Sequence, residues 1–400
     1  MRLDLGWRLD REVTFLNHGS YGACPEPVLE AQQAWRDRLE SEPVRFLSGE
    51  LPSLLAEARA SVGRFLDADP EGLAFVPNAT TGVNTVLQSL RFEPGDELLT
   101  DDHEYNATIN AMRAVATRDG ARVVVAPIPF PIASPDEALA AILAAVTDRT
   151  RLLLVSHVTS PTALILPMTD LVTEMDRRGI DTLVDGAHAP GMVPVDVDAL
   201  GAAYWTGNGH KWLCAPKGTA VLWVREDRRD RIHPLVVSHG ANEPLAGRTR
   251  FRHEFDWVGT SDPTGYLTLP AAIDWMDRCA IPESGGWPAV MAANHVLALR
   301  GRDIVAAALG IEAPAPDAML GSMAALPLAD VSNEAAATAL AAALEAEDRI
   351  QVPIGPWPVR AAQRDGETPQ ILLRISAQRY NEPTDYERLA DALVRRLRAN

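Results

Sequence analysis

The sequence predicts an α/β protein in which a mainly parallel central sheet is covered by helices on both faces. Between residues 73 and 224, short apolar segments typical of strands alternate with segments typical of helices. Such alternation implies crossover connections and parallel strands. Several of these strands are rich in Val and Leu throughout, as expected for strands buried on both faces. A chain of 400 residues is long enough for a large domain and a smaller one.

The elements can be assigned in order along the chain. Segment 15–25 is punctuated by Gly and Pro and is expected to be a loop or a short extended segment. Pro27 then opens a helix, and a second helix is expected over 51–66. The predicted strands are 73–76, 96–100, 122–128, 152–157, 180–184, 202–206 and 219–224. The helices predicted between them are 81–90, 108–118, 136–145 and 171–178.

After residue 224 the pattern weakens, and a compact α/β unit follows near the C-terminus. Its predicted elements are an Ala-rich helix 333–346, a strand 350–354, a loop through Gly366, a strand 371–376 and a helix 384–398. We therefore expect an N-terminal segment (1–20) near the active site, a large domain (21–265) that binds the cofactor, and a small C-terminal α/β domain (266–400).

Composition excludes several classes of function. The formal net charge of −17 argues against a nucleic-acid-binding surface, which requires a basic face. The first residues lack the apolar core of a signal peptide, and no uncharged segment reaches membrane-spanning length. The three cysteines have neither metal-ligand nor disulfide spacing. We expect a cytoplasmic protein with reduced thiols, without a metal, and with neither a membrane nor a nucleic acid as partner.

Acidic and basic side chains follow two strands that we expect to be neighbours. Asp185 and His188 come just after strand 180–184, and Asn208, His210 and Lys211 follow strand 202–206. Ligands of open α/β sheets bind at the carboxyl ends of strands. A lysine that forms a Schiff base and an acid that pairs with a pyridine nitrogen are what pyridoxal phosphate requires. The pattern predicts a pyridoxal phosphate site with these two residues at its centre.

Residues 78–82, Asn-Ala-Thr-Thr-Gly, separate a buried strand from a helix. Small and hydroxyl-bearing residues at a helix start leave backbone N–H groups free to bind a phosphate, and the helix dipole helps. The alternative is that Thr80 only caps the helix. With Lys211 downstream, we favour a phosphate site.

Together these motifs resemble a known family. The segments that carry the resemblance are NHGSYGACP, NATTG, DHEY, SHVTSPTALILP, VDGAHAPG, GHKWLCAPKGT, SHG, GTSDPT and LLRIS…YN. In this order and spacing they are similar to the class V aminotransferase family of fold-type I pyridoxal phosphate enzymes, and most of all to its isopenicillin N epimerase-like branch. The resemblance runs from Asn17 to the last predicted helix.

The resemblance implies a role for each matching residue. Lys211 is the Schiff-base lysine and proton shuttle, Asp185 pairs with the ring nitrogen, and His188 bonds the phenolate oxygen. The phosphate would be held by Ala79, Thr80, Asn208 and His210. Thr260 would reach the phosphate of the other subunit's cofactor, which implies a homodimer with its active site at the subunit interface. Arg374 would bind the carboxylate of an amino-acid substrate in a bidentate geometry, and Asn17, His18 and Tyr21 would lie at the substrate entrance.

Two positions depart from related desulfurases. Those relatives place a His over the ring from a His-His-Ala-Asn motif, whereas this chain has Asp102-His103-Glu104-Tyr105-Asn106. We assign ring stacking to Tyr105, with His103 as the alternative. Ser160 stands where those relatives have an Asn beside the phenolate oxygen, and its hydroxyl could take that place.

The substrate's α-carbanion has three fates that fit this sequence. Epimerisation is the favoured reading, with C–S bond cleavage by β-elimination second and transamination third. A desulfurase that transfers sulfur needs a nucleophilic cysteine before the carboxylate-binding arginine, and residues 349–374 contain none. A binding module without turnover has little support, because Lys211, Asp185 and Arg374 are all present.

Overall fold

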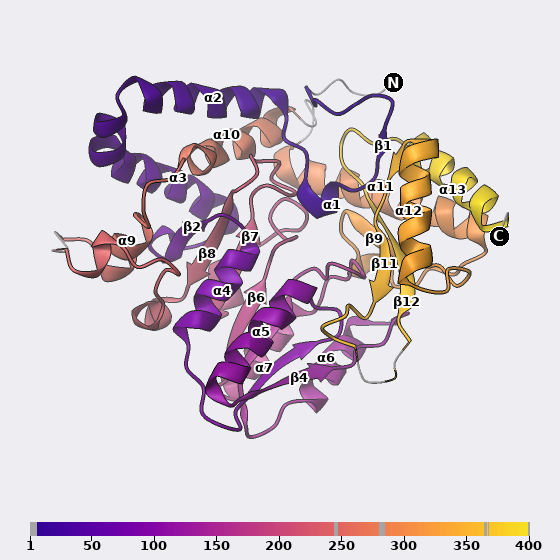
Figure 1. Cartoon of the computed structure of the whole chain (residues 1–400), viewed down its shortest axis with the longest axis horizontal. Helices are drawn as coiled ribbons and strands as arrows, with labels where there is room; N and C mark the ends of the chain where they lie inside the picture. Colours follow the sequence, from indigo (N-terminus) through magenta and orange to yellow (C-terminus); the bar gives the residue numbers. More distant parts are fainter. Residues whose placement is uncertain (1–5, 244–246, 280–284, 364–365, 367, 399–400) are drawn as a thin grey trace.

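The computed structural model describes residues 6–243, 247–279, 285–363, 366 and 368–398 (Figure 1). Its centre is a seven-stranded sheet with the order β2-β8-β7-β6-β5-β3-β4. These strands are β2 (Leu73–Val76), β3 (Glu97–Asp101), β4 (Arg122–Ala126), β5 (Thr150–Ser156), β6 (Asp181–Asp185), β7 (Tyr204–Asn208) and β8 (Ala220–Val224). The central pairings from β4 to β7 are parallel. Only β8 runs against its neighbours, pairing antiparallel with both β7 and β2. The predicted α/β class with a mainly parallel sheet is confirmed.

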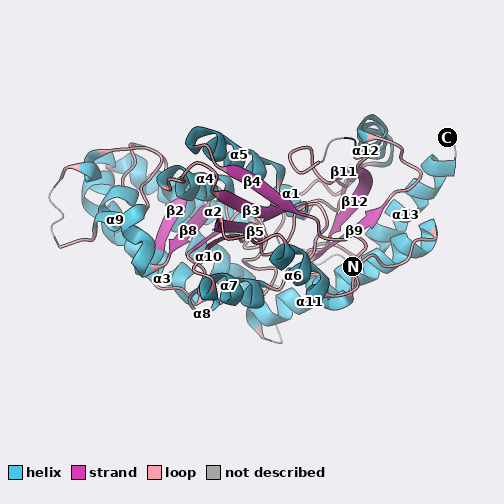
Figure 2. Ribbon diagram, turned by 90° about the horizontal axis from the view of Figure 1, so that it is seen from below, coloured by secondary structure: helices cyan, strands magenta, loops and turns pink. Residues whose placement is uncertain are grey.

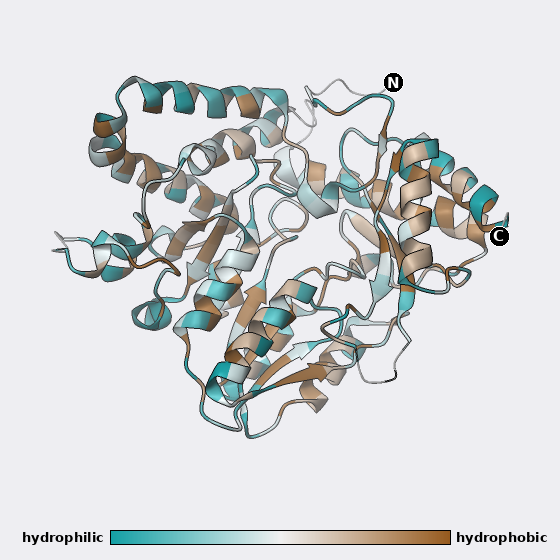
Figure 3. Cartoon of the chain, viewed as in Figure 1, coloured by the Kyte–Doolittle hydropathy of each residue, from teal (hydrophilic) through white to brown (hydrophobic). Residues whose placement is uncertain are grey.

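Both faces of this sheet are buried by helices (Figure 2). On one face, α4 (Ala79–Ser89) and α5 (Asn106–Asp119) share a core with Leu98, Leu154 and Leu183. The residues next to these leucines in the same strands point to the other face. There they pack with α6 (Pro135–Ala144) and α7 (Met168–Arg177). This period of two is the property of a strand whose successive side chains point to opposite faces. Figure 3 shows the resulting apolar strands at the centre and a largely polar α2 (Glu26–Ser41) outside.

The start of α4 is fixed by local hydrogen bonds. The side chain of Asn78 caps the helix, since its Oδ1 accepts the N–H of Thr81 at 2.8 Å. The alternative in which Thr80 caps the helix is therefore wrong. One turn later, a Cβ on Gly82 would lie 2.2 Å from Oγ1 of Thr206, so glycine is needed for α4 to approach β7 this closely.

The C-terminal part contains a separate antiparallel sheet of three strands, β11-β12-β9. Its strands are β9 (Met323–Pro327), β11 (Ile354–Trp357) and β12 (Gln370–Ser376), and its helices are α11 (Gly286–Leu309), α12 (Glu334–Asp348) and α13 (Pro383–Arg398). The predicted α12, β12 and α13 are present. The single strand expected over 350–354 is instead two, because β10 (Ile350–Gln351) leaves this sheet to pair with β1 (Thr14–Phe15).

Residues 14–21 contact both the smaller sheet and the segment that carries Lys211. After β1, the N–H of Ser376 donates to the carbonyl of Leu16 at 2.9 Å, and a short helix α1 (His18–Tyr21) follows. We expected segment 15–25 to be a loop or an extended segment, but part of it is helical. Helix α10 (Thr264–Cys279) packs on α2, on α3 (Leu51–Leu66) and on α11. The domain boundaries at residues 20 and 265 stay predictions.

Among the helices of the described residues, none combines the length and the apolar character needed to cross a membrane. The cytoplasmic location stays a prediction.

Candidate active site

The carboxyl ends of β5, β6 and β7 bring the predicted residues together at one edge of the sheet. Asp185 is the last residue of β6 and pairs in register with Ser156, the last residue of β5. Asn208 is the last residue of β7, and Lys211 follows three positions later. Parallel strands end at the same edge, so residues 23 to 55 positions apart converge there.

Lys211 is one of only two lysines in the chain, the other being Lys217. Its Nζ lies 3.0 Å from Nε2 of His188. Burial, followed by the positive charge of Arg374, lowers the pKa of Lys211 to about 7, although Asp185 acts in the opposite direction. A large fraction of this amine is therefore neutral, hence nucleophilic and basic, near pH 7.

His188 is buried, and its tautomer follows from its neighbours. Nε1 of Trp212 donates to Nδ1 of His188 at 3.3 Å. Burial and the nearby Lys211 lower the pKa of His188 well below its ordinary value, so the ring is neutral. Because Nδ1 accepts, the single ring proton is on Nε2 and points to the amine of Lys211. The ring thus offers a donor inside the site, which is what the predicted contact with a phenolate oxygen requires.

The carboxylate of Asp185 is held by two donors. Its Oδ1 accepts the N–H of Ala187 at 3.0 Å, and its Oδ2 accepts the hydroxyl of Thr108 in α5 at 3.2 Å. Burial raises its pKa, while the N–H of Ala187, the charge of Lys211 and the hydroxyl of Thr108 act against that rise. These contacts fix the orientation of the carboxylate, and its pairing with a ring nitrogen stays a prediction.

Two of the predicted phosphate residues, Ala79 and Asn208, meet at the first turn of α4. The N–H of Ala79 donates to Oδ1 of Asn208 at 2.9 Å, and the N–H of Thr81 is taken by Asn78. Thr80 lies between these two positions. Nδ1 of His210 is 3.2 Å from the carbonyl of Thr219, and burial with the charge of Lys211 lowers its pKa to about 4. The structure thus brings Thr80, Asn208 and the start of α4 together. Thr260, in contrast, is exposed on the loop that follows α9 (Arg250–Phe255).

Arg374, in β12, reaches the site from the smaller sheet. Its Nη1 donates to the carbonyl of Ser160 at 2.6 Å and to its Oγ at 3.1 Å, and its Nη2 donates to Oγ of Ser20 at 3.0 Å. Nε is buried and has no hydrogen-bond partner among the described residues. Burial lowers the pKa of Arg374 to about 10, with nearby Tyr105 acting against that shift. Ser160 therefore contacts Arg374; its contact with the phenolate oxygen stays a prediction.

The N-terminal residues occupy different environments. Oδ1 of Asn17 accepts the hydroxyl of Ser20, which in turn accepts from Arg374. Tyr21 is 72% exposed. His18 is completely buried behind Lys211, with Nδ1 2.8 Å from the Tyr380 hydroxyl and Nε2 3.1 Å from the Lys211 carbonyl. We expected His18 at the substrate entrance. It instead packs against the backbone of Lys211 and is fully buried.

Tyr105 and His103 point to different places. Tyr105 is 46% exposed at the start of α5 and lies within electrostatic reach of Arg374. His103 is fully buried, with its ring nitrogens 2.7 Å from Oγ1 of Thr162 and 3.1 Å from the carbonyl of Ile128. The described contacts of the His103 ring nitrogens do not include Tyr105. Which of the two rings stacks on the cofactor stays a prediction.

Sequence reasoning missed a group of buried acids beside this site. Glu104 is completely buried, and both of its carboxyl oxygens lie 2.9 Å from Oγ of Ser156. Asp101, at the end of β3, is also completely buried. The signal was present in the sequence, because three acids within four residues follow a strand that ends at the edge carrying the site.

This chain is similar to known proteins over most of its length. The model of the family "Aminotransferase class-V" matches residues 17–389. The chain is 38% identical to an isopenicillin N epimerase of Amycolatopsis lactamdurans, covering 96% of this chain and 95% of that protein. It is 32% identical to a probable chloroplastic L-cysteine desulfhydrase of Arabidopsis thaliana, covering 96% and 83%.

Solved structures show the same fold. The cystine C-S lyase C-DES in complex with its product cysteine persulfide has a TM-score of 0.78 at 23% identity, covering 96% of this chain and 98% of that chain. The apo cysteine desulfurase of Thermococcus onnurineus NA1 has a TM-score of 0.80 at 21% identity, covering 97% and 96%. The predicted fold-type I architecture is confirmed. By the family match over most of its length, this chain belongs to the class-V aminotransferases, which are pyridoxal-phosphate-dependent enzymes.

Proposed function

We propose that this enzyme inverts the configuration at the α-carbon of an amino-acid substrate. The observation that carries the proposal is the presence of two proton-handling groups near Arg374. The charge of Arg374 lowers the pKa of Lys211, and Tyr105 affects the pKa of Arg374 in turn, so both groups lie within electrostatic reach of the guanidinium. The 38% and 35% identity to two isopenicillin N epimerases supports this reading.

The residues present fit pyridoxal phosphate. Lys211 offers an amine of lowered pKa for the aldehyde, and Asp185 offers a buried carboxylate for the ring nitrogen. His188 offers an N–H for the phenolate oxygen. The start of α4, with Thr80, Asn208 and His210, would hold the phosphate. When bound, the cofactor supplies an electron sink for negative charge on the substrate's α-carbon.

Three side chains then have separate roles in the transfer of the α-proton. Arg374 holds the substrate carboxylate, for which its unpartnered Nε and its hydrogen-bonded Nη atoms provide donors. Lys211 accepts the α-proton with its neutral amine. Inversion needs a donor on the other side of the α-carbon, and the half-exposed phenol of Tyr105 supplies it.

The test is the fate of the α-proton in deuterated water. We expect the wild-type enzyme to incorporate deuterium with inversion, measured by chiral chromatography and mass spectrometry. Tyr105→Phe should keep exchange with retention through Lys211 and lose inversion. A matched control is Tyr204→Phe, because the buried Tyr204 hydroxyl has no hydrogen-bond partner among the described residues. If Tyr105→Phe inverts its substrate as fast as wild type, the second acid lies elsewhere.

A C–S lyase is the second candidate, favoured by the 32% identity to L-cysteine desulfhydrases. In that reaction Tyr105 would protonate the leaving group. Release of a keto acid with ammonia and a thiol would identify it, whereas stoichiometric pyridoxamine phosphate would identify a transaminase.

Transfer of sulfur through a persulfide stays disfavoured. Residues 349–374 contain no cysteine. Cys24 and Cys214 are buried, and burial raises the pKa of Cys24 to about 12 and that of Cys214 well above its ordinary value. Neither thiol is therefore a ready nucleophile, because the thiolate is the attacking form.

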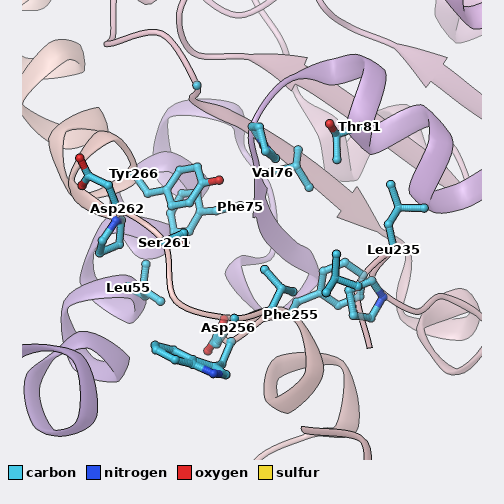
Figure 4. A pocket seen from close by; sticks show the side chains of 18 of the residues that line it. Leu55, Phe75, Val76, Thr81, Leu235, Phe255, Asp256, Ser261, Asp262 and Tyr266 are labelled. Carbon is cyan, nitrogen blue, oxygen red and sulfur yellow. The ribbon is translucent and has the colours of Figure 1, made fainter. Parts of the chain in front are cut away.

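We also propose that the active form is a homodimer whose sites lie at the subunit interface. An apolar cavity of about 420 Å³ opens next to Thr81 of α4 and is lined by Leu55, Phe75, Tyr266 and Leu235 (Figure 4). Large apolar side chains are exposed on nearby segments: Leu235, Val236, Val237 and Val258. Exposed apolar groups of this kind favour a protein partner.

The exposed Thr260 lies on the loop that borders this cavity, so a second copy seated there would bring Thr260 toward a phosphate site. Mixing Lys211→Ala with Thr260→Ala subunits should then create hybrid dimers with one intact site and restore activity that both parents lack. Full activity in a species that sediments as a monomer would contradict the proposal, and Val237→Asp should produce an inactive monomer.

A further inference from the structure

Glu104 is a second carboxyl beside Asp185, and the reaction does not account for it. It has no exposed surface. Its Oε1 accepts the N–H of Tyr105 at 2.6 Å, and both oxygens contact the hydroxyl of Ser156. Ser156 is the register partner of Asp185, and Thr108, one turn after Tyr105, bonds Asp185. Glu104 thus joins the loop that carries Tyr105 to the strands that carry the acid of the site.

The charges around Glu104 are mostly negative. Asp185 faces it from β6 and Asp101 from β3, and both act to raise the pKa of Glu104 in addition to burial. His103, next to it in the loop, is neutral because burial lowers its pKa to about 4, and the same holds for His157 after β5. The positive charge of Lys211 acts on Asp185, which also has the N–H of Ala187.

Two buried carboxylates without a cation between them cannot both ionise cheaply. Asp185 is the one with the nearby lysine, so it keeps the negative charge. The N–H of Tyr105 and the hydroxyl of Ser156 lower the pKa of Glu104, but burial and the two neighbouring acids outweigh them, so the net shift is upward. In the neutral form Oε1 would accept the N–H of Tyr105, and a proton on Oε2 would donate to Oγ of Ser156, the reverse of the direction in which the hydroxyl donates to a carboxylate.

We propose that Glu104 is a neutral carboxylic acid whose hydrogen bond to the Tyr105 backbone positions Tyr105 beside Arg374. The importance of Glu104 for inversion rests on the proposed function of Tyr105. The protonation state of Glu104 and its hydrogen bond to the Tyr105 amide are independent of that function. Glutamine has the same shape and the same pattern of one acceptor and one donor. Leucine has a similar size and neither group.

The first measurement is amide hydrogen exchange at Tyr105 in the cofactor-free protein. Glu104→Gln should leave the exchange rate unchanged at neutral pH. Glu104→Leu should raise it on the order of fivefold to tenfold, the effect of one lost hydrogen bond of ordinary net strength. As pH rises, wild type should lose protection relative to Glu104→Gln, because ionised Glu104 is repelled by Asp185 and Asp101.

The second measurement is infrared absorption of protonated carboxyls at neutral pH. The band should decrease in Glu104→Gln relative to wild type. Burial and the neighbouring Asp102 raise the pKa of Asp101 to about 7, so Asp101→Asn serves to subtract its contribution. A missing Glu104 band, or a Tyr105 amide exposed by Glu104→Gln as much as by Glu104→Leu, would overturn the proposal.

The third measurement separates this proposal from the proposed function. In the loaded enzyme, Glu104→Gln should invert the substrate like wild type at neutral pH and keep that rate at alkaline pH, where wild type declines. If no amino acid is inverted by wild type, the proposed function fails, while the exchange and infrared results still decide the state of Glu104.

Discussion

The amine of Lys211 is expected to titrate near pH 7 in the cofactor-free protein, because burial and Arg374 lower its pKa to about 7. At pH 7 half of this amine is then neutral. An ordinary lysine, with a pKa near 10.4, is only about 0.04% neutral at that pH. The structure therefore predicts a neutral fraction roughly 1,000-fold larger, which is the form that condenses with an aldehyde.

Two substitutions should move this pKa in opposite directions. Arg374→Gln removes a positive charge that disfavours the protonated amine, so the pKa of Lys211 should rise. Asp185→Asn removes the negative charge that favours it, so the pKa should fall further. Glu345→Gln, on the exposed surface of α12, is a matched control that changes one charge far from the site and should not move it.

The two-lysine composition makes the assay direct. Brief acetylation of the cofactor-free protein at pH 5 to 10, followed by mass spectrometry of the two lysine peptides, gives the reactivity of Lys211 and Lys217 separately. A free lysine derivative in the same tube corrects for the reagent. The reactivity of Lys211 should level off above about pH 8. A rate that keeps rising tenfold per pH unit to pH 10 would refute the reasoning, because it would show an ordinary amine.

Three further outcomes are expected. Lys211→Ala should abolish turnover and leave the fold intact, and borohydride reduction of the holoenzyme followed by peptide mapping should place the pyridoxyl group on Lys211; a label on Lys217 would show that the site is misassigned. Asn78→Ala should lower the free energy of unfolding by about 1 kcal/mol, measured by chemical denaturation, because it removes the N-cap of α4; no change would mean that the cap is replaced. Burial and Lys211 lower the pKa of His210 to about 4, and this pKa should rise when inorganic phosphate binds, because a nearby anion favours the imidazolium. NMR titration with and without phosphate measures the change. An unchanged pKa would place His210 outside the phosphate site.

Stability should also depend on pH through Glu104. Its pKa in the folded protein is raised, so the folded state binds its proton more tightly than the unfolded chain does. The resulting stability is fully present below the unfolded pKa near 4.3 and is lost as pH rises through the folded pKa. Thermal unfolding of the cofactor-free protein should therefore weaken with rising pH more in wild type than in Glu104→Gln. Parallel curves for the two proteins would contradict this prediction.

Several features could be predicted from the sequence because they depend on local pattern. Strands buried on both faces are continuous apolar segments, so β5, β6 and β7 were found close to their true ends. The position of Asp185 and Lys211 relative to those ends then placed both residues at the edge of the sheet that carries the candidate site. Arg374 was assigned by resemblance, and the structure places it in β12 next to the N-terminal segment.

Other features escaped prediction because they depend on partners far away in the sequence. Strand β9 and helices α10 and α11 have no predicted counterpart; β9 is specified by pairing with β12, about fifty residues later. His103 and Glu104 are adjacent in the chain, yet one bonds Thr162 and the other bonds Ser156.

The sequence by itself determined the fold class, the family and the position of Asp185 and Lys211 at the ends of neighbouring strands, since each follows from apolar periodicity and from motifs along the chain. Only the tertiary structure decided which histidine faces Lys211, which serine holds Arg374 and which acid lies beside Asp185. The physical reason is that a side chain's protonation and hydrogen bonds are set by the groups that surround it in space, and in this protein those groups come from strands and loops that are 23 to 362 positions apart.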